Sequence, residues 1–146
     1  MPAMHVFTYG TLMIPSVMEA VTGRRFAAQK AMLHNYARFR LKDATYPGLV
    51  EAAGATTDGV LYLDIDAPSL ARLDAFEGAF YQRTRVEVDT PEGERWPAEV
   101  YVVQPHHRRH LSFEAWRLDD FRREHLEAFL ASYHGFSADR SETQTP

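Results

Sequence analysis

One glutamate stands out among the residues that could do chemistry, because it breaks the pattern around it. On a helical wheel turning about 100° per residue, Glu77 falls between Leu70 and Leu73. It therefore lies on the face of its helix that should point inward. Burial disfavours the charged form of a carboxyl group and raises its pKa, and the negative end of the helix dipole near Gly78 acts in the same direction. Such a group suits general acid/base catalysis near neutral pH.

Two other interpretations of Glu77 stay open at this point. The helix could fray before Gly78, so that the Glu77 side chain turns to solvent. Alternatively, Glu77 could form an ion pair with a buried arginine such as Arg83. Either arrangement would leave the carboxyl group with a structural role or none.

A second candidate lies near the amino terminus, in the tetrapeptide Tyr9, Gly10, Thr11 and Leu12. A loop that leaves a strand and enters a helix exposes several main-chain N–H groups, which suit a carboxylate or a phosphate. Gly10 would allow a ligand to approach the backbone closely. The alternative is an ordinary strand-to-helix turn without a ligand.

The histidines His106, His107 and His110 form the third group considered. His106 and His110 have the i,i+4 spacing that can hold a metal on a helix. However, no carboxylate is placed to complete the set, and Arg108 and Arg109 would repel a cation. We therefore expect a solvated loop here and no metal site.

Several elements must position these residues. Strands are expected at residues 5–9, 31–41, 59–65, 81–89 and 98–103, with turns at residues 43–48 and 91–93. Helices are expected from Pro15 or Ser16 to Gly23, from Asp66 to Gly78, and from Ser112 or Leu118 to His134. Short turns between strands of alternating polarity favour a mostly antiparallel sheet or a small barrel.

The composition fits a single globular domain. The chain has 146 residues and no cysteine, which excludes thiol nucleophiles, cysteine-based zinc sites and disulfide scaffolds. Sixteen lysines and arginines against twenty aspartates and glutamates give a formal net charge of −4, which disfavours nucleic-acid binding. We expect one domain over residues 1–136, a disordered polar tail at 137–146, no membrane segment and a cytoplasmic location.

Taken in order, the motifs of this chain resemble those of the gamma-glutamylcyclotransferase-like proteins. This family includes the plant avirulence-induced group and the gamma-glutamylamine cyclotransferases. The resemblance covers roughly residues 5–104, and it is specific because the separate motifs occur together and in the same order. The matching segments are Val6-Phe7-Thr8-Tyr9-Gly10-Thr11-Leu12, Tyr46-Pro47-Gly48-Leu49, Gly59-Val60-Leu61-Tyr62, Leu73-Asp74-Ala75-Phe76-Glu77-Gly78 with Tyr81 and Arg83, and Ala98-Glu99-Val100-Tyr101.

The resemblance implies an α+β fold, in which a small, mixed and mostly antiparallel barrel-like sheet is flanked by helices. It also implies a pocket closed by the loop at Tyr9 to Leu12, with Glu77 as the general acid/base. Substrate binding would involve Tyr9, Gly10, Thr11 and Leu12, and would extend to Met13 and Ile14. We also expect Tyr81 to line this pocket, because it follows Glu77 by four residues just past a turn.

The activity implied by the resemblance is the release of 5-oxoproline from a small-molecule γ-glutamyl amine or peptide. The substrate supplies its own nucleophile, so no metal or cofactor is expected. Two alternatives stay open: hydrolysis or acyl transfer on a γ-glutamyl metabolite, and a non-catalytic module that binds a small carboxylate.

Overall fold

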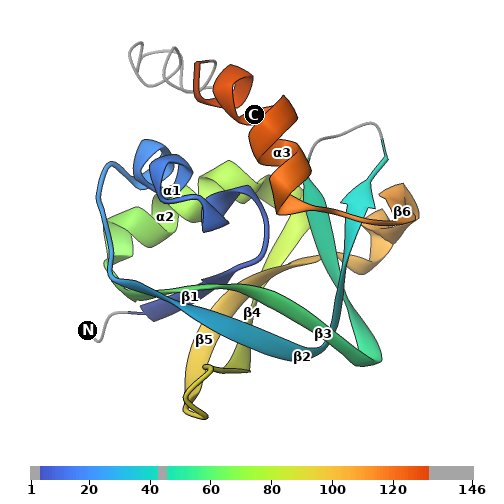
Figure 1. Ribbon diagram of the computed structural model, residues 1–146, viewed down its shortest axis with the longest axis horizontal. Helices are drawn as coiled ribbons and strands as arrows, with labels where there is room; N and C mark the ends of the chain where they lie inside the picture. Colours follow the sequence, from blue (N-terminus) through green and yellow to red (C-terminus); the bar gives the residue numbers. More distant parts are fainter. Residues whose placement is uncertain (1–3, 43–45, 132–146) are drawn as a thin grey trace.

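The computed structural model describes residues 4–42 and 46–131, and its strands form a closed, barrel-like sheet (Figure 1). Five strands follow one another in the order β3-β1-β5-β4-β2, and pairing between β2 and β3 closes the ring. A sixth strand, β6, extends the sheet beside β2. The strands are β1 (Met4–Thr8), β2 (Ala28–Leu41), β3 (Pro47–Ile65), β4 (Tyr81–Asp89), β5 (Arg95–Val103) and β6 (Leu111–Ala115).

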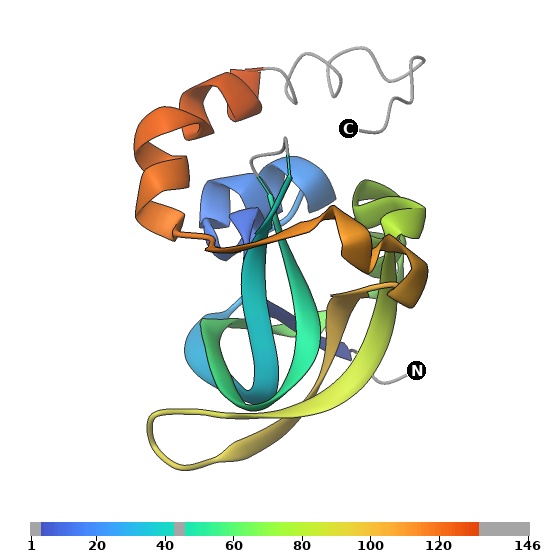
Figure 2. The same ribbon diagram turned by 90° about the vertical axis from the view of Figure 1, so that its right-hand side faces the viewer.

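Most of the strand pairs are antiparallel, as expected, and β1 with β5 is the parallel pair. The β2–β3 hairpin is the longest ladder, and it bends at a register shift between His34 and Tyr36. Figure 2 shows that β4 and β5 form a second long hairpin that extends beyond the body of the sheet. The expected α+β barrel-like fold with flanking helices is therefore confirmed.

The strand expected at residues 59–65 is the last third of a much longer element. β3 begins at Pro47 and continues for 19 residues, so the predicted turn at residues 43–48 is wrong for its last two residues, while residues 43–45 lie outside the described part. The first two thirds of β3 are rich in alanine, glycine and acidic residues, which have low strand propensity. Pairing with β2 along the hairpin holds this part extended instead.

The helices cover one end of the barrel. They are η1 (Thr11–Met13), α1 (Pro15–Thr22), α2 (Ala67–Glu77), η2 (Gly78–Phe80), η3 (Pro105–His110) and α3 (Leu118–Glu124). Helix α2 starts where predicted, at Asp66, which caps it by accepting a hydrogen bond from the Ser69 N–H at 3.1 Å. Gly23 ends α1, also as predicted, with a φ of 81°. In Figure 1, α1 and α2 lie side by side above the strands.

Two hydrophobic clusters hold these layers together. One fills the barrel around Phe7, Leu33 and Leu61, and the other joins the sheet to α1 and α2 around Met18 and Leu73. Gly59 is required for this packing, because an added Cβ would lie 2.6 Å from the Phe7 ring and would also meet the Thr8 carbonyl oxygen. The strand β1, which leads into the loop at Tyr9, is held by β3 on one side and by β5 on the other.

The carboxy-terminal third differs from the sequence-based prediction in three ways. Ser112, one of the two proposed helix starts, lies in β6, and the helix begins at the other, Leu118. The segment containing the three histidines forms the exposed 3-10 helix η3 and not a loop. The long helix is interrupted at His125 before it resumes, and its predicted end and the tail at 137–146 lie outside the described residues. None of the helices within residues 4–42 and 46–131 has the length and hydropathy of a membrane span.

Candidate active site

A pocket of about 210 Å³ opens where the end of β1 meets the end of α2. Its walls include the loop residues Tyr9, Gly10, Thr11 and Leu12, together with Glu77 and Tyr81. The structure therefore brings together the two regions that sequence analysis selected separately. Seven of the fourteen lining residues are aromatic, and none of the described lining residues is a lysine, an arginine or a histidine.

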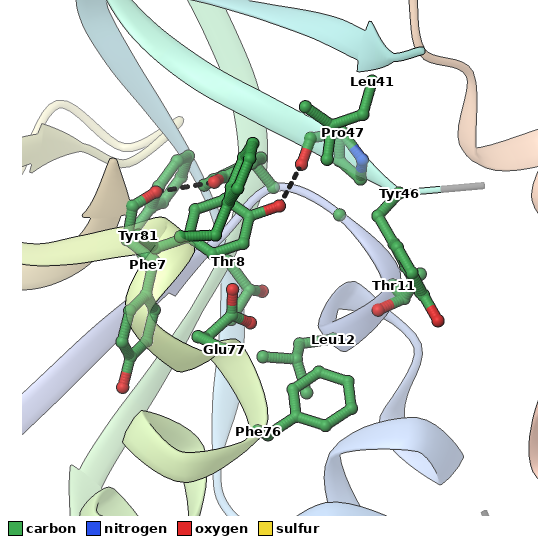
Figure 3. A pocket seen from close by; sticks show the side chains of 14 residues that line it. Phe7, Thr8, Thr11, Leu12, Leu41, Tyr46, Pro47, Phe76, Glu77 and Tyr81 are labelled. Atoms are coloured by element: carbon green, nitrogen blue, oxygen red, sulfur yellow. Dashed lines mark hydrogen bonds between the residues drawn. The ribbon is translucent and has the colours of Figure 1, made fainter. Parts of the chain in front are cut away.

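Helix α2 places Glu77 at the pocket because Glu77 continues the inward-facing row of Leu70 and Leu73. Leu73 is fully buried and Leu70 nearly so, and Glu77 follows on the same inward face as the last residue of the helix. Gly78, with a φ of 76°, then turns the chain into η2. In Figure 3 the Glu77 carboxyl group points into the space among the labelled side chains, with Leu12 and Phe76 below and to its right.

The two structural interpretations of Glu77 are both wrong. Helix α2 is intact up to Glu77, and the side chain borders the pocket. The arginine considered as a partner, Arg83, instead approaches Asp74 at 3.5 Å and Glu99 at 3.7 Å. Within the described part of the chain, no cation or hydrogen-bond donor pairs with the Glu77 carboxyl group. It is a carboxyl group enclosed by protein whose open side faces a cavity.

This environment changes the acidity of Glu77. Desolvation, followed by the negative charge of Asp74, raises the pKa of the Glu77 carboxyl group from 4.5 to about 8. Near neutral pH, this group is therefore mainly protonated but can give up its proton readily. Such a group can both accept and donate a proton during a reaction.

The loop at residues 9–14 has its carbonyl groups occupied by protein donors. Arg38 donates to the Tyr9 carbonyl at 2.9 Å, and the Tyr62 hydroxyl donates to the Leu12 carbonyl at 2.8 Å. The Gly10 and Thr11 carbonyls accept from the N–H groups of Met13 and Ile14 inside η1. The first N–H groups of a helical turn have no acceptor within it, so those of Thr11 and Leu12 remain for other partners.

The remaining predicted site residues divide into two groups. Tyr81 lines the pocket as expected, and its hydroxyl donates to the Pro47 carbonyl at 2.8 Å (Figure 3). Met13 and Ile14 do not line it. Ile14 is buried in the cluster under α1, and the sulfur of Met13 lies 4.0 Å from an Arg38 nitrogen. These two residues carry the N–H groups that complete η1.

Sequence reasoning assigned no role to several other residues of the pocket. Tyr101 comes from β5, Phe80 from η2, and Tyr46 immediately precedes β3. Arg38, on β2, lies behind the loop and holds it through the Tyr9 carbonyl. The motifs quoted above contained Tyr46 and Tyr101, but nothing in the linear spacing shows that they converge on Glu77.

Tyrosine hydroxyl groups in this pocket stay protonated at neutral pH. Burial, followed by the charge of Glu77, raises the pKa of Tyr81 and Tyr46 above the ordinary value of 10.0. Burial, followed by the hydrogen bond to Asp74 and by neighbouring charges that include Glu77, raises the pKa of Tyr101. Burial, followed by the Tyr81 hydroxyl and Glu77, does the same for Tyr9. Each hydroxyl group is therefore a potential hydrogen-bond donor.

The histidine segment lies beside the pocket and not in it. The His107 ring stacks on Phe80, with ring centroids 4.7 Å apart. No cluster of three or more potential metal ligands occurs among the residues described by the structure. Desolvation, followed by neighbouring positive charge, lowers the pKa of His107.

Comparisons with known proteins place this pocket in a family context. Residues 6–118 match the family described as "Gamma-glutamyl cyclotransferase, AIG2-like". "Protein AIG2 C" from Arabidopsis thaliana is 29% identical over 132 residues, which cover 88% of this chain and 78% of that protein. "AIG2-like protein C" from the same organism is 30% identical over 139 residues, covering 94% and 80%.

Solved structures agree with the fold. The solution structure of a protein from Arabidopsis thaliana matches with a TM-score of 0.69 and 26% identity, covering 95% of this chain and 84% of that one. A structure described as "Gamma-glutamyl cyclotransferase" matches with a TM-score of 0.63 over 70% of this chain and 67% of its own. At 18% identity, this second likeness concerns the fold alone.

Proposed function

The chain belongs to the gamma-glutamyl cyclotransferase, AIG2-like family, and from that premise we propose that it releases 5-oxoproline from a small γ-glutamyl amine or peptide. The observation that carries the proposal is the carboxyl group of Glu77, which faces a pocket whose lining is half aromatic and, among the described residues, includes no lysine, arginine or histidine to neutralise it. A carboxyl group in such surroundings costs stability, and acid/base catalysis is a function that requires it.

In the proposed reaction the substrate attacks itself. Its α-amine forms a bond to the γ-carbonyl carbon, the ring closes, and the bond from that carbon to the departing nitrogen breaks. The products are 5-oxoproline and the free amine, and no other reactant is consumed. Because the nucleophile is tethered, the pocket accelerates the reaction by holding the chain in its ring-closing conformation.

Glu77 would transfer the proton in this sequence. Its ionised form takes a proton from the attacking amine, and the resulting carboxylic acid returns a proton to the departing amine. A group with a pKa of about 8 is suited to both steps. A fully exposed carboxylate with an ordinary pKa would be too weak a base for the first step.

The loop at residues 10–12 would stabilise the negative charge that develops on the substrate during the reaction. Gly10, Thr11 and Leu12 line the same pocket, and the main-chain carbonyls of Tyr9 and Leu12 are held by Arg38 and Tyr62. Main-chain donors fixed in this way can stabilise the oxygen that becomes negative when the amine attacks.

Product analysis tests the proposal. The purified protein would be incubated with a panel of γ-glutamyl amides, and the products separated. Release of 5-oxoproline with an equal amount of amine supports the cyclotransferase. Free glutamate would instead indicate hydrolysis, and saturable binding of γ-glutamyl compounds without turnover would indicate a binding module.

A further inference from the structure

The hydroxyl group of Tyr46 differs from those of the other tyrosines in the pocket. Among the described residues it makes no hydrogen bond, although its ring is half-buried and borders the cavity. The other three hydroxyls have a protein acceptor at 2.6–2.8 Å, namely Tyr9 on the Tyr101 carbonyl, Tyr81 on the Pro47 carbonyl and Tyr101 on Asp74. The hydroxyl groups of those three tyrosines already donate to the protein, whereas the Tyr46 hydroxyl is available to a ligand.

Thr11 presents a second hydroxyl without a partner. Its residue is only 5% exposed and lines the pocket, yet within the described chain its side chain makes no hydrogen bond. A hydroxyl group that borders a pocket can bond to water or to a ligand there, and a ligand that displaces the water must replace that bond, because an unpaired hydroxyl costs about 1–3 kcal/mol. The Thr11 hydroxyl can regain that bond from a ligand in the cavity.

The position of these hydroxyls relative to Glu77 indicates what they would bind. A γ-glutamyl group carries an α-carboxylate, and no described residue with a positive charge lines the pocket to receive it. Neutral donors must therefore hold it, and repulsion favours a place away from Glu77. In Figure 3, Tyr46 and Thr11 lie to the right of Glu77, whereas the Tyr81 ring lies above it with its hydroxyl bonded to the Pro47 carbonyl.

We propose that the hydroxyl groups of Tyr46 and Thr11 form the subsite for the α-carboxylate of the γ-glutamyl group. This proposal rests on the proposed function and adds the residues that recognise the glutamyl part of the substrate. Two donors directed at one carboxylate would also orient the α-amine, which is bonded to the same carbon, toward Glu77. Tyr46 and Thr11 would thereby select substrates that retain this carboxylate.

The surroundings of Tyr46 hold its ring ready for this role. Phe129 packs edge-on against it, with ring centroids 6.4 Å apart. The next residue, Pro47, lies so close to Gly10 that a Cβ there would approach the proline Cγ to 2.7 Å. Tyr81 fixes the Pro47 carbonyl from the other side. A donor fixed before the ligand arrives loses little conformational entropy on binding.

Calorimetric titration with 5-oxoproline tests the subsite directly, because this molecule keeps the carboxylate. Tyr46→Phe removes the hydroxyl and keeps the ring. We expect its Kd for 5-oxoproline to rise about ten- to a hundredfold, the range for a hydrogen bond to a charged group. Tyr36→Phe is the matched control, because Tyr36 is a partly exposed tyrosine of β2 outside the pocket lining, and we expect no change.

A ligand without the carboxylate serves as the control for 5-oxoproline in the same two proteins. 2-Pyrrolidinone has the same ring and lacks the carboxylate, so its affinity should be weak and equal in the parent and in Tyr46→Phe. Unchanged 5-oxoproline affinity in Tyr46→Phe would overturn the proposal, as would equal losses for both ligands. Failure of the parent to bind 5-oxoproline would overturn it as well.

Kinetics separate this proposal from the proposed function. With a γ-glutamyl amide that the parent converts, Tyr46→Phe should raise KM with kcat nearly unchanged, because the carboxylate is held equally before and during the reaction. A fall in kcat without a change in KM would assign Tyr46 to the reacting carbonyl and overturn the carboxylate subsite. If the parent binds 5-oxoproline through Tyr46 but converts no γ-glutamyl amide, the subsite stands and the proposed function fails.

Discussion

The guanidinium group of Arg38 donates a hydrogen bond of 2.9 Å to the main-chain carbonyl of Tyr9, 29 residues earlier in the chain. Arg38 also bonds the main-chain carbonyl and the carboxylate of Asp58 on β3, at 3.1 and 2.8 Å. A single, largely buried side chain thus fixes the pocket loop to the β2–β3 hairpin. The orientation of the loop N–H groups depends on this attachment.

Replacing Arg38 should therefore impair the site without removing a residue that lines it. Arg38→Met keeps much of the aliphatic stem and loses the bond to Tyr9. We expect kcat/KM for 5-oxoproline release to fall about tenfold or more, the loss for one charge-assisted hydrogen bond. Steady-state kinetics and a melting curve would be recorded together, so that unfolding is detected separately.

Asp58→Asn is the matched control for Arg38. It removes the charge of the Arg38 partner but leaves the bond to the Tyr9 carbonyl in place. Because the Asp58 side chain is 68% exposed, this ion pair should contribute little. Equal losses of activity in the two variants would show that the loss of the bond to Tyr9 does not cause the fall in kcat/KM.

The neighbouring carboxylate of Asp74 should set the pH at which Glu77 works. Asp74→Asn removes a negative charge that raises the pKa of Glu77, and it retains an oxygen for the Tyr101 hydroxyl. If the ionised form of Glu77 starts the reaction, the rate rises with pH through the pKa of this group. The midpoint of that rise, about pH 8 in the parent, should move to lower pH in Asp74→Asn.

A pH–rate profile of both proteins checks this shift. Glu87→Gln serves as the control, since Glu87 on β4 is 64% exposed and does not line the pocket. Its midpoint should equal that of the parent. If the midpoint in Asp74→Asn is unchanged or moves to higher pH, Asp74 does not raise the pKa of Glu77.

Glu77 should also make the stability of the fold depend on pH. The folded protein holds the Glu77 proton up to about pH 8, whereas an unfolded chain loses it near 4.5. The stabilisation from this proton is therefore complete below pH 4.5 and is lost as the pH rises to 8. Glu77→Gln carries no titrating group here, so its Tm relative to the parent should increase between pH 5 and pH 8.5.

Thermal melts at these two pH values measure that change. We expect an increase of about 4 °C or more, and for a chain of this size about 2–4 °C corresponds to roughly 1 kcal/mol. The comparison is internal to each pH, so other titrating groups cancel. A Tm difference that is the same at both values would show that Glu77 titrates normally in the folded protein.

The sequence was sufficient for the features that depend on local periodicity. The helical wheel placed Glu77 on the inward face between Leu70 and Leu73, and the Asp66 cap and the glycine after α1 marked their helices correctly. These signals lie within a few residues of the element they describe. The motif order then led to the correct family and barrel-like fold.

The features that were missed depend on contacts between distant segments. The early part of β3 is extended because β2 pairs with it, and β6 exists because its residues add to the edge of β2. Similarly, the pairing of Arg38 with Tyr9 and of Tyr101 with Asp74 joins residues 29 and 27 positions apart. No periodicity within one segment can reveal such contacts.

The central claim is that the carboxyl group of Glu77 transfers the proton, and one comparison tests it most directly. The rate of 5-oxoproline release from an accepted γ-glutamyl amide would be measured for the parent and for Glu77→Gln, after circular dichroism has shown that both are folded. Glutamine keeps the shape of the side chain and removes its basicity. We predict a loss of about a thousandfold, within the range for general acid/base catalysis. Release at the parental rate by the folded variant would contradict the account.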